Sequence, residues 1–187
     1  MAVTDLPAQP NTQSVMQAAA AGEFSAMYQR EYPYVGKVLI RLGVRAADRE
    51  DLAHDVFVVA FRSWSKFDSS RPVRPWLFGI AFRVLRDRNS KHQNRFEQPV
   101  AEVDAVDGRR NAEEIASQRE ALQQVERALG ALELERRAVL VMHDIDETPM
   151  PQIAESLGLP LNTAYSRLRL ARRDFNEAVA RLQRECA

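Results

Sequence analysis

Apolar residues recur at intervals of three and four along most of this chain, and no stretch alternates with the period of two that a half-buried strand requires. Only 7 of the 187 residues are glycine. The spacing predicts one helix or a pair of helices over 24–42, and further helices over 48–64 and 76–88. Helical spacing resumes near 113, with interruptions at 148–149 and 158–160. We therefore expect an all-α protein.

One acidic stretch divides the chain. "EQPVAEVDAVDGRR", residues 97–110, breaks the helical spacing with a proline, a glycine and several carboxylates, as linkers do. The sequence predicts two helical modules, over 22–95 and 113–187, joined by a flexible linker over 96–112. Residues 1–21 lack the basic start and apolar run of a secretion signal, and we expect them to be a disordered lead-in.

The formal net charge of zero conceals an uneven distribution of charge. Arg71–Arg95 contains seven basic residues and one acid, and Leu159–Arg184 contains six arginines and two acids. Solvated helix faces would account for either block alone. Two basic blocks, each following a helix and a turn, favour a polyanionic partner.

Composition narrows the class of protein further. No apolar run approaches the roughly 18 residues of a membrane span, so we expect no membrane contact by the chain itself. The single cysteine, Cys186, cannot form an internal disulfide, which indicates a cytoplasmic protein. We expect its thiol to be a solvated terminal group, with a redox switch as the alternative.

The stretch "IAESLGLPLNTAYSRLRLARRDF", residues 153–175, has the pattern of a helix-turn-helix. Thr148 is predicted to cap a first helix that ends at Gly158. On the second helix, one side is apolar and the other polar and rich in arginine. Such a helix can enter the DNA major groove, where arginines read guanine edges or bind phosphates. The alternative is an ordinary amphipathic surface helix. The apolar side carries Leu161, Ala164, Leu168, Ala171 and Phe175, and the polar side carries Asn162, Ser166, Arg169 and Arg173.

Two segments of the first module carry a family resemblance. "DREDLAHDVFVVAFRSWSKF" (48–67) and "RPWLFGIAFRVLRDRN" (74–89) resemble the central segments of bacterial RNA polymerase sigma factors of the extracytoplasmic-function (ECF) group, in the sigma-70 family. That group has an E-D-L-x-x-D/E-V-F helix followed by a W-L-x-x-I-A helix. The later stretch 153–172 resembles the group's promoter-binding helix-turn-helix, and the resemblance extends from about Glu23 to Arg184.

The resemblance implies a transcription initiation factor that binds core RNA polymerase, directs it to promoters and helps to melt the −10 element. It assigns polymerase binding to an acidic helix in the first module, although a solvated acidic face would look the same. His54 stands where relatives usually carry glutamine. The residues implied are Asp48, Glu50, Asp51, His54, Asp55 and Phe57.

Aromatic and basic residues alternate after this acidic helix, with Phe78 and Phe82 among the aromatics. Bases of single-stranded DNA stack on rings while arginines bind phosphates. The resemblance implies −10 binding here, with one base flipped into a pocket formed by the loop 67–75. Core packing is the alternative for Trp76. The candidate residues are Phe67, Arg71, Arg74, Trp76, Arg83, Arg86, Arg88 and Asn89.

The helix-turn-helix is expected to bind the −35 element as duplex DNA. Two positions depart from the family: Tyr165 replaces a usual Lys or Arg, and Leu170 replaces a frequent Arg. A leucine there could contact a thymine methyl group or another protein. The candidate residues are Asn162, Thr163, Tyr165, Ser166, Arg167, Arg169, Leu170 and Arg173.

Other kinds of protein fit less well. The three histidines, His54, His92 and His143, have no partner at metal-ligand spacing, and the chain has no phosphate-binding glycine loop. We therefore expect no enzyme activity, cofactor or metal. A conventional repressor or activator is the main alternative, because it explains the second module but not the first. The resemblance also implies an anti-sigma factor as an inhibitory partner.

Overall fold

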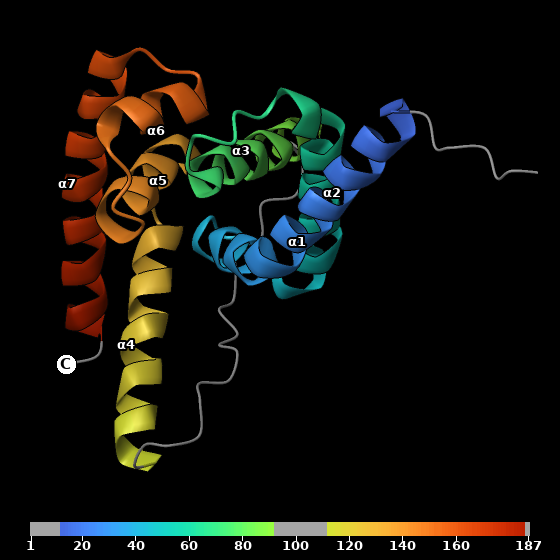
Figure 1. Cartoon of the computed structure of the whole chain (residues 1–187). Coiled ribbons are helices and arrows are strands. Elements are labelled where there is room, and N and C mark those ends of the chain that lie inside the picture. Colours follow the sequence, from blue (N-terminus) through green and yellow to red (C-terminus); the bar gives the residue numbers. More distant parts are fainter. Residues whose placement is uncertain (1–11, 92–111, 186–187) are drawn as a thin grey trace, which may run out of the picture.

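The computed structural model describes the backbone of residues 12–91 and 112–185, and the side chains of 21–90 and 120–185. Within these ranges the regular structure is entirely helical, which confirms the all-α prediction (Figure 1). The first module contains α1 (Thr12–Arg41), α2 (Ala46–Ser63), the short 3₁₀ helix η1 (Trp64–Lys66) and α3 (Val73–Lys91). The second contains α4 (Ala112–Gly130), α5 (Leu134–Leu140), the π-helical segment η2 (Val141–Ile145), α6 (Met150–Leu157) and α7 (Leu161–Glu185).

The helices form because their apolar stripes meet in a core. In the first module Leu39 of α1, Val56 of α2 and Phe78 of α3 are fully buried. In the second module Ile153 of α6 and Ala171 of α7 are fully buried. Burying a side chain of valine size or larger stabilises a fold by about 1.5–3 kcal/mol, so these contacts hold each group of helices together.

The observed boundaries differ from the predicted ones at three places. Helix α1 begins at Thr12, so the lead-in predicted for 1–21 overlaps its first turns, and residues 1–11 lie outside the described residues. The predicted linker 96–112 also lies outside them, except for Ala112 at the start of α4. Helix α3 begins at Val73, within the predicted loop. Pro75 is tolerated there because the first N–H groups of a helix have no intrahelical partner.

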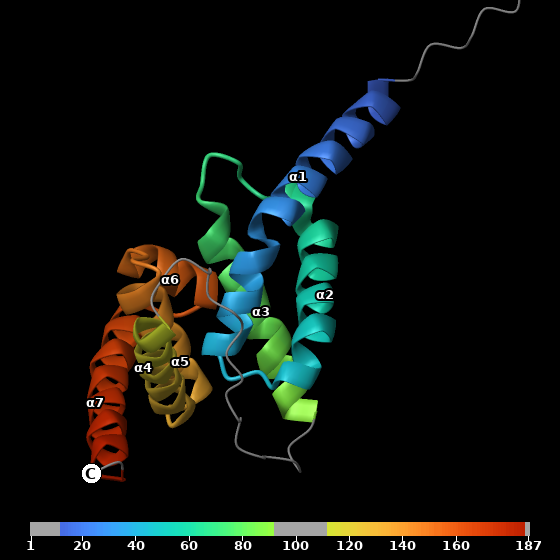
Figure 2. The same ribbon diagram turned by 90° about the horizontal axis from the view of Figure 1, so that it is seen from below.

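The two modules are in direct contact. Figures 1 and 2 show α3 lying beside α6, and the C-terminal end of α1 lying near α5. Asp146, which follows η2, accepts hydrogen bonds from the Tyr34 hydroxyl at 2.7 Å and from Arg41 Nη1 at 2.8 Å. Burial raises the pKa of Tyr34, and the hydrogen bond to Asp146 raises it further. The hydroxyl therefore remains a proton donor in this bond across the physiological pH range.

A buried arginine completes the contact between the modules. Arg137 of α5 is only 8% exposed. Its guanidinium donates to the carbonyl of Leu42, at the end of α1, at 2.7 Å, and to those of Gly130 and Leu132, at the end of α4, at 2.8 and 2.7 Å. Burial lowers its pKa to about 10, so it stays charged at neutral pH. A cation suits this position because the last carbonyls of a helix lack intrahelical partners and carry partial negative charge.

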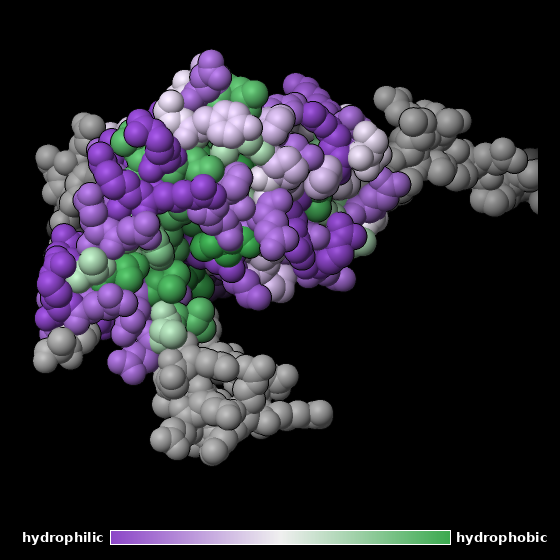
Figure 3. Space-filling view, turned by 90° about the vertical axis from the view of Figure 1, so that its left-hand side faces the viewer, coloured by the Kyte–Doolittle hydropathy of each residue, from purple (hydrophilic) through white to green (hydrophobic). Residues whose placement is uncertain are grey.

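The face of the molecule on which α7 lies is largely hydrophilic. Figure 3 shows this face, with purple side chains over much of it and apolar side chains gathered in its middle and lower part. Two exposed apolar residues of α4 are Leu122 and Val125.

Candidate polymerase and nucleic-acid interfaces

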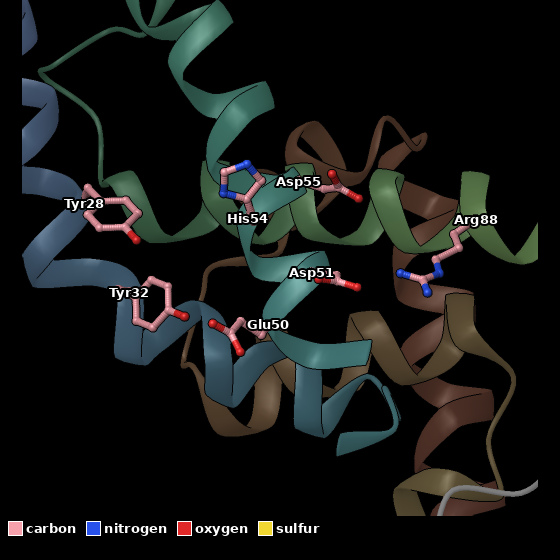
Figure 4. A pocket seen from close by; sticks show the side chains of 7 residues that line it. All are labelled: Tyr28, Tyr32, Glu50, Asp51, His54, Asp55 and Arg88. Atoms are coloured by element: carbon pink, nitrogen blue, oxygen red, sulfur yellow. The ribbon is translucent and has the colours of Figure 1, made fainter. Parts of the chain in front are cut away.

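An acidic face lies over the first module. It surrounds an open cavity of about 520 Å³ (Figure 4). Helix α2 contributes four exposed polar residues because they follow one another at helical spacing away from the buried stripe. The face is lined by Tyr28 and Tyr32 from α1, by Glu50, Asp51, His54 and Asp55 from α2, and by Arg88 from α3.

Four of the six predicted polymerase-binding residues are exposed, whereas Phe57 is buried and Asp48 is partly buried. Phe57 is 4% exposed and packs against the rings of Tyr28 and Tyr32, at centroid distances of 4.6 and 5.9 Å. It supports the acidic face from beneath and does not present a contact surface, because its position belongs to the apolar stripe of α2. Asp48 is partly buried and paired with Arg45 and Arg88.

Arg88 lies apart from most of the other predicted −10 residues. Its Nη2 donates to Asp48 Oδ1 at 2.7 Å, so it belongs to the acidic face. A rise of 1.5 Å per residue places it about 21 Å along α3 from Arg74. Asn89, beside it, is exposed at the same end of the helix. The sequence grouped them with the −10 surface because they share a helix with it.

An aromatic cluster lies where the loop between η1 and α3 begins. Phe67 stacks on Trp64 at a centroid distance of 5.4 Å and contacts Trp76 at 4.6 Å. Phe24 extends the cluster by packing edge-on against Trp64 and Phe61. The sequence did not predict that Phe24, Phe61 and Trp64 belong to this cluster, although the spacing of three between Phe61, Trp64 and Phe67 places those three rings on one side of the chain. Trp76 is half-buried in the cluster, in agreement with the core-packing alternative.

Two aromatic residues expected near DNA are in the core. Phe78 and Phe82 are 0% and 2% exposed, so neither ring can stack on a base. Arg86 is exposed and lies over the Phe82 ring, with 5.7 Å between its guanidinium carbon and the ring centroid. The alternation of aromatic and basic residues on α3 therefore reflects an inner and an outer side of one helix.

The basic residues just before and at the start of α3 already have protein partners. Arg74 donates to Glu31 at 2.9 Å and lies over the Tyr34 ring at 5.0 Å. The pKa of Glu31 is lowered overall: burial raises it, but hydrogen bonds from Arg30 and Arg74 outweigh the burial. Arg71 forms two hydrogen bonds with Glu155 of α6.

The helix-turn-helix forms as predicted, apart from its first residues. Gly158 has φ of +66°, a conformation that favours glycine, and ends α6. Thr148 is not the cap of α6: the helix begins at Met150, and the Pro149 carbonyl accepts from Gln152 N at 2.9 Å. Thr148 is buried, and its N–H donates to Met142 O at 2.8 Å, so it belongs to the preceding turn.

The exposed face of α7 carries the polar residues that the spacing predicts. Ala164, Leu168 and Ala171 are buried. Leu161 was predicted on the apolar side but is 42% exposed, because it lies at the first position of the helix, beyond the core. Of the departures from the family, Tyr165 is 53% exposed and Leu170 is half-buried, as are Thr163 and Arg167. The exposed polar residues are Asn162, Ser166, Arg169, Arg172 and Arg173.

The arginines of this face differ in their partners. Arg172 forms two hydrogen bonds with Asp144, at 2.6 and 2.9 Å, and these bonds lower the pKa of Asp144. Arg173 pairs with Asp174 at 2.8 Å. Arg169 has no hydrogen bond or ion pair with any residue that the structure describes. Unlike Arg172 and Arg173, it can therefore contact a DNA base without first breaking an ion pair with a carboxylate.

The described part of the chain holds no group of three His, Cys, Asp or Glu residues placed to bind a metal ion. None of the helices described is both long and apolar enough to cross a bilayer. Cys186 lies outside the described residues.

Each of the two modules matches a known family model. The family model of Sigma-70 region 2 matches residues 27–95, and that of Sigma-70, region 4 matches residues 122–175, so that together they cover more than half of the chain. The chain belongs to the sigma-70 family. As a sigma factor, it binds RNA polymerase and promoter DNA and initiates transcription at specific promoters. The region 2 match explains the first module, which a conventional repressor or activator leaves unexplained.

Several relatives of this sigma factor are named as ECF sigma factors. It is 29% identical over 154 residues to the ECF RNA polymerase sigma factor RpoE of Cereibacter sphaeroides, covering 79% of this chain and 81% of that protein. It is 25% identical over 167 residues to the RNA polymerase sigma factor NccH of Alcaligenes xylosoxydans xylosoxydans, covering 86% and 90%.

Two solved structures share its fold. The structure of CnrH in complex with the cytosolic domain of CnrY has a TM-score of 0.61 at 25% identity, covering 89% of this chain and 96% of that chain. The sigma factor RpoE in complex with the anti-sigma factor NepR from Bartonella quintana has a TM-score of 0.66 at 21% identity, covering 84% and 97%.

Proposed function

We propose that this sigma factor uses three separate surfaces, one to bind core RNA polymerase and two to bind the promoter. The acidic face of α2 docks on core RNA polymerase. The aromatic cluster, with Arg71, Arg74, Arg83 and Arg86, binds the −10 element as a single strand and helps to melt it. The exposed face of α7 binds the −35 element as duplex DNA, and the chain acts by binding alone, in the cytoplasm.

The observation that carries this proposal is that the two ends of α3 lie beside different surfaces. Arg88, at one end, lies among the carboxylates of the acidic face, whereas Arg71 and Arg74 lie near the other end, beside the aromatic cluster. Because DNA phosphates are repelled by carboxylates, the acidic face suits a basic protein partner and the far end suits DNA.

An anti-sigma factor is proposed as a further partner. It would cover the polymerase-binding and DNA-binding surfaces. The support is the fold shared with CnrH, whose structure was solved with the cytosolic domain of CnrY. Co-purification of a small protein encoded by a neighbouring gene, together with inhibition of transcription by it, would support this; failure of every neighbouring product to bind would reject it.

Asp51→Lys tests the assignment of the acidic face. Asp51 is exposed, so the change should leave the fold intact while placing a positive charge opposite a basic partner. We expect the affinity for core polymerase to fall at least about tenfold, about 1.4 kcal/mol, as measured by competition for core enzyme and by transcription in vitro from promoters of the source genome.

Glu120→Lys provides a matched control, because it makes the same charge reversal at an exposed position on α4. Equal losses from both variants would contradict docking at the acidic face. No transcription from any promoter with the unmodified protein would count against the proposed function as a whole.

A further inference from the structure

A cluster of three polar side chains joins η2 to α7, the second helix of the helix-turn-helix. Arg172 of α7 donates to Asp144 of η2 from Nε at 2.9 Å and from Nη2 at 2.6 Å. Nδ1 of His143, also in η2, lies 2.6 Å from Asp144 Oδ1. The segment that carries His143 is a π-helical turn, a form that is rare and frequent at functional sites. His143 belongs to none of the three proposed surfaces.

The cluster borders the face of α7 to which −35 binding is assigned. Arg172 follows Arg169 by three residues and Tyr165 by seven, so these three side chains lie along one side of the helix. The side chains of His143 and Arg172 are 34% and 51% exposed. A duplex bound along α7 can therefore contact both of them with its backbone.

Asp144 decides which nitrogen of His143 carries a proton. The pKa of Asp144 is lowered, chiefly by the hydrogen bonds from Arg172, which outweigh the effect of burial, so the carboxylate is ionised at neutral pH. An ionised carboxylate only accepts hydrogen bonds, and Nδ1 is therefore the donor in the 2.6 Å bond. Arg172 Nη2 lies further from Nδ1, at 3.3 Å. In the neutral imidazole Nε2 then carries no proton.

A phosphodiester also only accepts hydrogen bonds, so neutral His143 offers it no donor. Protonation places a proton on Nε2 and changes the net charge of the cluster from zero to +1, because Asp144 and Arg172 offset each other. Arg172 Nη1 forms no hydrogen bond with any residue that the structure describes, and it supplies a second donor. Protonation therefore converts a neutral cluster into one that can bind an anion.

The charged groups beside the imidazole are Asp144, from its own segment, and Arg172, from α7. Helices α5 and α6 also pack against η2, but within the described ranges neither forms a hydrogen bond or ion pair with His143. Asp146, three residues further on, is bonded to Tyr34 and Arg41 instead. Histidine is the side chain that ordinarily changes charge between about pH 5 and 8, so protonation falls in a range that experiments reach easily.

We infer that His143 and Arg172 form an additional phosphate-binding site beside the −35 face, and that this site binds a phosphodiester of the duplex only when His143 is protonated. The inference rests on the proposed −35 role of α7. Binding of the −35 duplex is consequently strengthened by a proton. The contribution of His143 is fully present at low pH and is lost as the pH rises through the range in which the imidazole loses its charge.

The test uses polymerase holoenzyme and a fluorescein-labelled duplex that contains the −35 element and ends upstream of the −10 element. Fluorescence anisotropy gives the affinity at several salt concentrations, at pH 6.0 and at pH 8.0. We expect binding at moderate salt to be about threefold weaker at pH 8.0, the size of an exposed ion pair. The plot of log affinity against log salt should be steeper at pH 6.0 by up to about 0.9, because one more phosphate is neutralised.

Two variants assign the effect to His143. His143→Gln stays uncharged, so it should give the shallower slope and the weaker binding at both pH values. His143→Arg stays charged, so it should give the steeper slope and the tighter binding at both. His92→Gln, the same exchange at a histidine outside the described residues, should retain the pH dependence of the unmodified protein.

The unmodified protein alone can overturn the inference, whether or not the variants fold: equal salt slopes at the two pH values would do so. Retention of the full pH dependence by His143→Gln would also overturn it. A pH effect confined to some −35 sequences would indicate a base contact and reject the phosphate assignment. Failure of the proposed −35 role itself would look different, because scrambling the −35 element would then leave the affinity unchanged at both pH values.

Discussion

Arg137→Ala is expected to lower the free energy of unfolding by about 3–5 kcal/mol. The guanidinium is buried and donates to three carbonyls at the ends of α1 and α4. Alanine would leave these carbonyls without a donor in a site that water reaches poorly, and it would remove a cation from two helix C-termini. With an m-value of about 2 kcal/mol/M, the urea midpoint should fall by about 1.5–2.5 M.

The control for this prediction is Arg127→Ala. Arg127 is exposed in the last turn of α4, so its loss removes a favourable helix-end charge that contributes less than about 1 kcal/mol. Similar midpoints for the two variants would contradict the role assigned to Arg137. Because Arg137 joins both modules, its loss should also separate their unfolding transitions when each is followed by its own probe.

Arg169→Ala is expected to relax sequence preference at one or two positions of the −35 element, by about 1–3 kcal/mol each. Arg169 lies in the middle of the exposed face of α7 and has no protein partner among the described residues. A bidentate contact with guanine would therefore be lost without any compensating rearrangement. The measurement is binding of polymerase holoenzyme to a promoter library at two salt concentrations.

Arg173→Ala is the contrasting variant. Arg173 lies one turn further along α7 and is already paired with Asp174 and Glu177. We expect it to bind phosphate, so its loss should weaken all sequences alike and lower the salt dependence by about one unit of slope. If both variants caused the same uniform loss, the assignment of Arg169 to base reading would be wrong, and the sigma-factor assignment would remain.

Local pattern was enough to predict the helices and the face of α7. Periodic apolar residues predict which side of a helix is buried because every helix in water has to cover that side. The buried Ala164, Leu168 and Ala171 confirm this for the recognition helix, and Gly158 confirms the turn before it. The ordered motifs likewise carried the family resemblance that the two family models confirm.

The spacing of residues in the sequence was less informative about which residues of one helix share a surface. Phe78, Phe82 and Arg88 all lie on α3 with the −10 candidates, yet two are in the core and the third belongs to the acidic face. Their positions depend on what packs against each turn of α3, and that is set by helices distant in the sequence. Phe57 became a supporting residue for the same reason, because α1 covers it.

The sequence by itself determined the helical elements, the helix-turn-helix and the acidic helix, since each follows from residue types at short, regular spacing. Only the tertiary structure decided that the two modules touch, that Arg137 donates hydrogen bonds to carbonyls at the ends of two helices, and that Arg71 is paired with Glu155. These interactions join residues up to 112 positions apart. Hydrogen bonds and ion pairs act over a few ångströms, so they exist only after folding has brought such residues together.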